Sequence, residues 1–147
     1  MIIHDDESDY RASAPKYDAE NGAAWYFVKS HGTLVAKTPY ARSWDETGYL
    51  SAAVPSTATF KWVFIVPHQA AVVSDLLLMQ FAGFITAVVT PSLSMGVGHA
   101  FGVAAGAITD EGADPTLDED EFAVSTAATT SATTHNMWLM GIEVVHP

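Results

Sequence analysis

The chain has 147 residues, enough for one domain of ordinary size with a substantial hydrophobic core. Only 16% of its residues are charged, below the usual ~25%, and its formal net charge is −11. Nucleic-acid binding depends on Lys and Arg contacts to phosphates, so a chain with six such residues and this charge is a poor candidate for it. The absence of cysteine excludes disulfides and thiolate chemistry.

The charges are distributed unevenly along the chain. Between Gly48 and Thr109 only Lys61 and Asp75 are charged, whereas 13 of the 17 acidic residues lie in residues 1–20 and 110–121. A long segment with so few charges must be buried within the protein, against a partner, or in a bilayer. The N-terminal residues are acidic and lack the apolar core of a secretory signal, so we do not expect one.

The first part of the chain predicts an extended arm followed by strands. Residues 1–24 are polar and interrupted by Pro15 and Gly22, which is typical of an N-terminal arm preceding a single β domain over residues 25–147. Residues 23–29 (AAWYFVK) and 33–37 (TLVAK) are two short apolar runs around a glycine-containing turn. They predict a β-hairpin, and residues 44–48 predict a loop after it.

Residues 60–66 (FKWVFIV) contain the clearest strand signal in the chain. Both alternating faces are mostly apolar, one with Phe60, Trp62, Phe64 and Val66 and the other with Lys61, Val63 and Ile65. A strand that is apolar on both faces is typical of the inside of a sandwich or barrel.

The rest of the chain consists of short apolar runs separated by turn residues. Strands are predicted at residues 70–73, 84–89, 100–108 and 137–145, the last with Trp138, Met140, Ile142 and Val144 on one face. Residues 76–81 (LLLMQF) favour a helix by propensity. Residues 110–121 predict a solvated acidic loop, and residues 125–134 fit either a loop or an edge strand. Together these runs predict an all-β, single-domain sandwich or barrel with at most one short helix.

No residue pattern gives a positive argument for catalysis, a cofactor or a metal. The histidines have no metal-binding spacing and are expected in turns or on the surface (His4, His31, His68, His99, His135 and His146). Gly96, Gly98 and Gly102 depart by one residue from the dinucleotide-binding spacing and are better explained as strand-end and bulge glycines. Residues 110–121 lack the EF-hand pattern. We therefore expect a non-enzymatic protein with no cofactor.

A membrane interpretation depends on Gly98, Gly102 and Gly106, which have the GxxxG spacing of transmembrane helix contacts. The apolar runs at residues 76–90 and 93–108 are shorter than the roughly 20 residues that a spanning helix needs. They also lack a basic flank that would set their orientation. The strand signal at residues 60–66, with its period of two, also favours a β protein. We therefore expect no membrane partner.

Three segments carry a family resemblance: AAWYFVKSHGTLVAKTPY (23–40), FKWVFIVPHQAAVV (60–73) and TTHNMWLMGIEVV (133–145). They resemble the N-terminal hairpin, the second block and the terminal strand of bacteriophage capsid decoration proteins, also called head-stabilising or cement proteins. The likeness lies in apolar and glycine positions. The chain departs from that family at Pro67-His68, where a glycine turn is more typical, and in its acidic insertion at residues 110–121.

The resemblance implies a virion structural protein on the outer surface of the capsid. Its partners would be the major capsid protein, whose subunits it bridges, and other copies of itself, with a trimer favoured over a dimer. Tyr10, Arg11 and Tyr17 in the arm are the candidate partner contacts, as aromatic and cationic anchors. No nucleic acid, membrane or small-molecule substrate is expected as a partner. The alternatives are another head-completion or tail component and, less favoured, a small membrane protein with two short spans.

Overall fold

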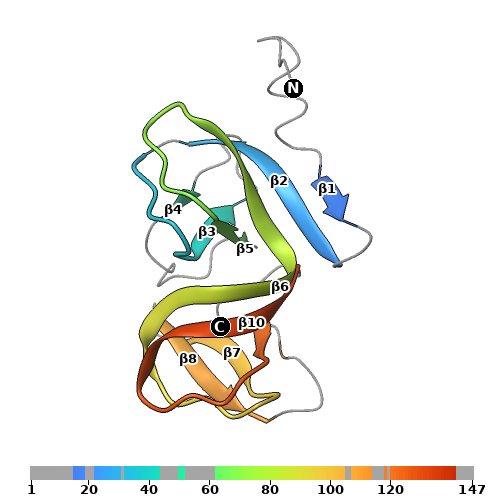
Figure 1. Cartoon of the computed structure of the whole chain (residues 1–147), viewed down its shortest axis with the longest axis vertical. Coiled ribbons are helices and arrows are strands. Elements are labelled where there is room, and N and C mark those ends of the chain that lie inside the picture. The colour runs from blue at the N-terminus through green and yellow to red at the C-terminus, as the bar shows by residue number, and fades with distance from the viewer. Residues whose placement is uncertain are drawn as a thin grey trace.

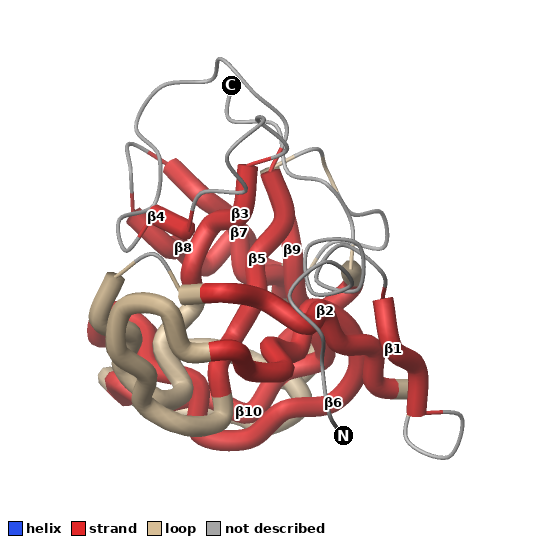
Figure 2. Tube along the Cα trace, turned by 90° about the horizontal axis from the view of Figure 1, so that it is seen from above, coloured by secondary structure: helices blue, strands red, loops and turns tan. Residues whose placement is uncertain are grey.

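The computed structural model describes residues 15–18, 22–30, 32–43, 50–51, 62–104, 107–113, 118 and 120–141. Within these residues the chain forms strands and no helix, which confirms the predicted all-β class (Figure 2). The strands are β1 (Pro15–Asp18), β2 (Ala23–Lys29), β3 (Tyr40–Ser43), β4 (Leu50–Ser51), β5 (Trp62–Pro67), β6 (Leu76–Leu93), β7 (Ala100–Ala104), β8 (Ala107–Gly112), β9 (Glu121–Ser125) and β10 (Ala132–Met140).

All strand pairs are antiparallel, in the order β4-β3-β5-β6-β10-β9-β7-β8, with β2 also on β6 and β1 on β2. Figure 1 shows β6 passing from the upper half of the molecule, which holds β1 to β5, into the lower half, which holds β7, β8 and β10. The view from above shows β6 and β10 side by side (Figure 2). β6 therefore joins the two halves.

Residues 76–81 begin the long strand β6, so the helix expected there by propensity is wrong. The start of β6 pairs with β2 from Leu76↔Lys29 onward, and Met79 and Gln80 also pair with β5 on the opposite edge. Leu77 and Met79 are buried, whereas Leu76 and Leu78 are exposed. Pairing on both edges and one-sided burial therefore override the local preference for a helix.

β6 also continues through Thr90-Pro91, beyond residue 89, where the predicted strand ends. The register with β10 moves from Val89↔Thr134 to Leu93↔Ala132, so Pro91 lies inside an irregular stretch of the pairing. Proline has no N–H to donate, and bulges are among the places where a strand tolerates it.

The hairpin predicted within residues 23–40 is wrong. β2 pairs with β6 and β1, and the returning segment makes only an isolated bridge between Leu34 and Ala71. The distant partner gives β2 a better-matched apolar face, because the Tyr26 ring stacks on Phe81 with centroids 4.2 Å apart.

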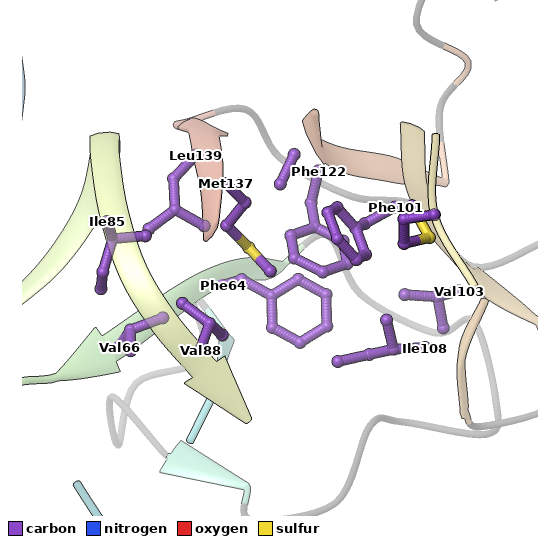
Figure 3. Close-up of a cluster of buried hydrophobic side chains, with 12 residues drawn as sticks. Phe64, Val66, Ile85, Val88, Phe101, Val103, Ile108, Phe122, Met137 and Leu139 are labelled. Carbon is purple, nitrogen blue, oxygen red and sulfur yellow. The ribbon is translucent and has the colours of Figure 1, made fainter. Parts of the chain in front are cut away.

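Two hydrophobic clusters form the interior, and β5 lies between them. Phe64 and Val66 belong to one cluster and Ile65 to the other, which confirms that both faces of this strand are buried. Figure 3 shows side chains from β5 to β10 converging on the first cluster, where the Phe64 and Phe122 rings lie 4.0 Å apart. The predicted core residue Phe60 and the side chain of Trp62 lie outside the described residues.

The C-terminal elements differ from prediction at their boundaries. Residues 100–108 form parts of the β7–β8 hairpin rather than one strand. The closing strand starts at Ala132, and it buries Met137 and Leu139 while Trp138 and Met140 stay exposed. Ile142 and Val144, predicted on the same face as Trp138, lie outside the described residues.

The acidic segment 110–121 is not a loop throughout. Asp110 and Glu111 belong to β8, and Glu121 begins β9 with only 2% of its surface exposed. The backbone N–H of Asp118 donates to Oε2 of Glu121 at 2.7 Å. The Glu121 side chain thus holds the turn before β9, and the hydrogen bond satisfies a polar group that would be costly to bury without a partner.

Residues 15–18 of the predicted arm form β1, in register with β2 from Pro15↔Tyr26 to Asp18↔Ala23. Residues 1–14 and 19–21 lie outside the described part of the chain.

Candidate interaction surfaces

The described residues expose ten large apolar side chains, which is the most unusual property of the surface: Val35, Val72, Val73, Leu76, Leu78, Phe84, Val89, Val97, Trp138 and Met140. Single exposed apolar residues need no explanation, but groups of them mark interaction sites. Two groups lie on strand faces.

The first group is the β6–β10 face, defined as Ala82, Phe84, Trp138 and Met140. Phe84 lies directly opposite Trp138, and Ala82 opposite Met140, across the antiparallel pair. Phe84 is 46% exposed and Trp138 is 42% exposed. None of the four is charged, so this face offers two aromatic rings on a rigid sheet without the cost of desolvating a charge.

Gly22, in the turn between β1 and β2, lies under Trp138. A Cβ atom added at Gly22 would come within 3.2 Å of Cζ2 of Trp138, and Gly22 also has a positive φ of 63°. Both properties favour glycine at this position, which allows the indole to lie close to the backbone.

The second group is the β2–β6 face, defined as Trp25, Phe27 and Lys29 of β2 with Leu76, Leu78 and Gln80 of β6. These residues are cross-strand partners in three alternate pairs of the register. The residues that alternate with them are buried at Tyr26, Leu77 and Met79. The β2–β6 face is therefore the outer face of the same two strands, and it remains mostly apolar.

Gln80 is the exception on this face, because it is polar yet only 1% exposed. Its Nε2 donates to the backbone oxygens of Ala82 at 3.0 Å and Phe84 at 2.9 Å. Its Oε1 lies 2.8 Å from Nε2 of His68. Since the Gln80 oxygen can only accept, His68 carries its proton on Nε2 and leaves Nδ1 as an acceptor.

Lys37 completes this hydrogen-bond network. Its Nζ lies 3.3 Å from Nδ1 of His68 and donates to it, and the ring of His68 lies 4.8 Å from that of Trp25. The backbone of Lys37, at a φ of 62°, donates to the Pro67 oxygen at 2.7 Å and accepts from the N–H of Val89 at 2.8 Å. The network therefore links β2, β5 and β6.

Burial lowers the pKa of His68 below its usual value, the Gln80 hydrogen bond opposes this shift, and the charge of Lys37 reinforces it. Burial also lowers the pKa of Lys37. His68 is therefore neutral near pH 7, as its two hydrogen bonds require. Its imidazole is committed to structural contacts.

The other described histidines are also hydrogen-bonded. Nδ1 of His99 lies 3.0 Å from a carboxylate oxygen of Asp110, which joins the turn before β7 to β8. His135 is 1% exposed, so the expectation of a turn or surface histidine is wrong at this position. Its Nε2 donates to the Ala132 oxygen at 3.0 Å, and its Nδ1 accepts from the Thr129 hydroxyl at 3.1 Å.

Among the residues that the structure describes, no three His, Cys, Asp or Glu side chains lie close enough to hold a metal ion. His4, His31 and His146 lie outside them.

Gly98 and Gly102 have the structural roles that the sequence predicts. Gly98 has a φ of 81° in the turn before β7, and its N–H donates to the Ser125 oxygen at 2.9 Å. Gly102 lies at a register shift between β7 and β9, where an added Cβ would come within 2.5 Å of Cγ of Glu111. These glycines therefore serve a turn and a bulge.

No described contact places the predicted partner-binding residues next to either of these faces. Tyr10 and Arg11 lie outside the described residues, and Tyr17 lies in β1 opposite Ala24 with its side chain undescribed. The β2–β6 and β6–β10 faces were not predicted as sites. The available signal was the run of apolar residues at 76–79, where both alternating positions are apolar although only one can face the core.

The described part of the chain contains no helix that is long and apolar enough to cross a membrane. The chain matches no protein-family model, no curated protein and no solved structure.

Proposed function

We propose that the protein is a non-enzymatic structural component of a bacteriophage virion. It is a decoration protein that binds the outer surface of the head and bridges major capsid protein subunits, which stabilises the head. The observation that carries this proposal is the exposed cross-strand pair of Phe84 and Trp138 on the uncharged β6–β10 face. Exposed aromatic residues on a rigid surface are the usual anchors of protein–protein interfaces.

The charge of the chain supports an exterior position. All six Lys and Arg residues lie at or before residue 61, and the formal net charge is −11. Packaged DNA would repel such a protein, whereas a protein lattice that covers the DNA does not require basic residues. The resemblance of residues 23–40, 60–73 and 133–145 to decoration proteins supports the same location.

The hydrogen-bonded architecture also suits a protein that bridges subunits. β6 pairs with β2, β5 and β10 along its length, and the Lys37 backbone adds links to Pro67 and Val89. A load applied to one end of β6 is therefore shared among several strands. In this role the protein also associates with further copies of itself.

The test is co-sedimentation with expanded heads of the cognate phage that lack a decoration protein. The wild type is expected to bind at saturating stoichiometry and to raise the temperature at which the heads release DNA. The double variant Phe84→Ser with Trp138→Ser should lose binding, and Val97→Ser, at a turn residue that is 67% exposed, should retain it. Circular dichroism verifies that each variant is folded.

Heads that neither bind the protein nor gain stability from it would refute the proposal. If the protein is instead located at the portal or tail in a virion reconstruction, it is a head-completion or tail component.

A further inference from the structure

One end of the β2–β6 face continues into an exposed apolar turn. We define the valine turn as residues 71–75, which connect an isolated bridge at Ala71 to the start of β6. Val72 is 60% exposed and Val73 is 62% exposed, and Leu76 and Leu78 follow at 41% and 44%. This end of the molecule thus holds most of the exposed aliphatic side chains of the described residues.

The exposure of the valine turn does not come from a loose backbone. The Ser74 N–H donates to the Ser30 oxygen and the Ser30 N–H donates to the Asp75 oxygen, both at 2.8 Å. The Asp75 carboxylate accepts from the Val72 N–H at 2.9 Å. A turn held this firmly presents Val72 and Val73 in fixed positions, which lowers the entropy cost of docking.

The ionisable side chains of this surface favour an acidic partner. Lys29 lies opposite Leu76 at the exposed end of β2, and Lys37 donates to neutral His68, whose ring lies beside that of Trp25. The carboxylate of Asp75 also lies in the turn, where it accepts from the Val72 N–H, so this surface carries two lysines against one carboxylate. Among the described residues the surface is therefore apolar, and its border is cationic because Lys29 and Lys37 outnumber Asp75.

The chain itself carries the complementary surface. Residues 62–147 contain no Lys or Arg and nine acidic residues. Glu111 on β8 and Asp118 before β9 are both exposed, and they flank β7. A second copy can therefore place its acidic β7–β9 end against the cationic border of the first.

We propose that the β2–β6 face and the valine turn bind the β7–β9 end of a second copy of this chain, in a head-to-tail contact. The inference specifies the self-association within the proposed function and rests on that part of it. Because two different surfaces meet, the contact is heterologous, so repeating it produces a closed ring or an open chain. Leu76 and Leu78 form the apolar centre, and Lys29 supplies the charge contact.

The test is size-exclusion chromatography with light scattering on the full chain over a range of concentrations. The wild type is expected to form a defined oligomer. The double variant Leu76→Ser with Leu78→Ser should weaken self-association at least about tenfold, because central interface residues carry most of the binding energy. Val89→Ser is the matched control, because Val89 is a 40% exposed residue of β6 outside both contact surfaces, and this variant should assemble as the wild type does.

Charge exchange tests the orientation of the contact. Lys29→Glu and the pair Glu111→Lys with Asp118→Lys should each assemble more weakly alone, and mixing the two variants should restore a complex through the swapped charges. The proposal is overturned if the wild type stays monomeric up to about 100 times the protein concentration used in the head-binding test. Full assembly of Leu76→Ser with Leu78→Ser also overturns it, as does failure of the mixed variants to assemble.

Head binding separates this inference from the proposed function. If the wild type is monomeric yet binds heads through Phe84 and Trp138, only the head-to-tail contact is wrong. If Leu76→Ser with Leu78→Ser loses head binding while the wild type is monomeric, the β2–β6 face contacts the head and the self-association proposal fails.

Discussion

His68 donates its Nε2 proton to Oε1 of Gln80 at 2.8 Å, and this bond fixes the tautomer in which Nδ1 accepts from Lys37. The folded protein lowers the pKa of His68, chiefly by burial. The unfolded chain therefore binds more protons than the folded chain at pH values between the folded pKa and the usual value near 6.5. We expect the free energy of unfolding to rise with pH through this window, and to fall as pH drops from about 6.5 through the folded pKa.

Urea unfolding of the wild type and of His68→Gln at several pH values from 5 to 8 measures this dependence. His68→Gln should show a shallower rise between pH 5 and 6.5. An NMR spectrum should show the Nε2–H tautomer of His68 at pH 7.5. Equal pH dependence in the two proteins would contradict the assignment.

The second prediction concerns β5, which lies between the two hydrophobic clusters. Phe64 is 2% exposed and its ring lies 4.0 Å from that of Phe122. Phe64→Ala should reduce the free energy of unfolding by about 3–5 kcal/mol, through lost burial and the cavity left behind. Phe84→Ala is the matched control, because Phe84 is 46% exposed and should lose less than about 1.5 kcal/mol. Similar losses in the two variants would mean that β5 is not central.

The third prediction concerns the bulge in β6 at Ala87. This exposed residue has a φ of 55°, and its N–H donates to Oδ1 of Asn136 at 3.1 Å. Ala87→Gly should stabilise the folded state by about 1–2 kcal/mol, because glycine adopts a positive φ without strain. The greater freedom of glycine in the unfolded chain should offset about 0.5–1 kcal/mol of this gain. A net stabilisation below about 1.5 kcal/mol is expected by thermal melting. Ala104→Gly, in a strand without positive φ, should be destabilising, and a loss of stability in both variants would argue against the strain.

The fourth prediction concerns buried His135, which accepts from the Thr129 hydroxyl and donates to the Ala132 oxygen. His135→Leu leaves both groups without their partner and should cost about 1–3 kcal/mol. Thr129→Val removes one of the two orphaned groups, so the double variant should lose less stability than the sum of the single variants. Strict additivity in a double-mutant cycle would show that the two side chains do not interact.

The sequence predicts elements of this fold where the signal is local. Phe64, Ile65 and Val66 alternate between two apolar faces, and both faces are buried because β5 has a cluster on each side. The pairing of β2 could not be predicted in the same way. Its partner starts at Leu76, far along the chain, and a nearer run around Leu34 matches a hairpin equally well by composition.

The candidate surfaces were harder to predict than the core. Leu76, Leu77, Leu78 and Met79 are all apolar, so the sequence shows no alternation there, and only the three-dimensional arrangement shows that Leu77 and Met79 face the interior. The burial of Glu121 could not be predicted either, because Glu121 stands in a run of carboxylates. Its burial depends on a hydrogen bond from the Asp118 backbone. Long-range contacts, rather than residue type, decide these cases.

The continuity of β6 has a consequence for how the molecule unfolds. The strand contributes Leu77 and Met79 to one hydrophobic cluster, and Ile85 and Val88 to the other. Unfolding of either cluster would remove packing contacts from β6, and the other cluster depends on the same strand. The two halves should therefore denature in one cooperative transition. Unfolding of one cluster alone is therefore disfavoured, and the described strands should unfold together.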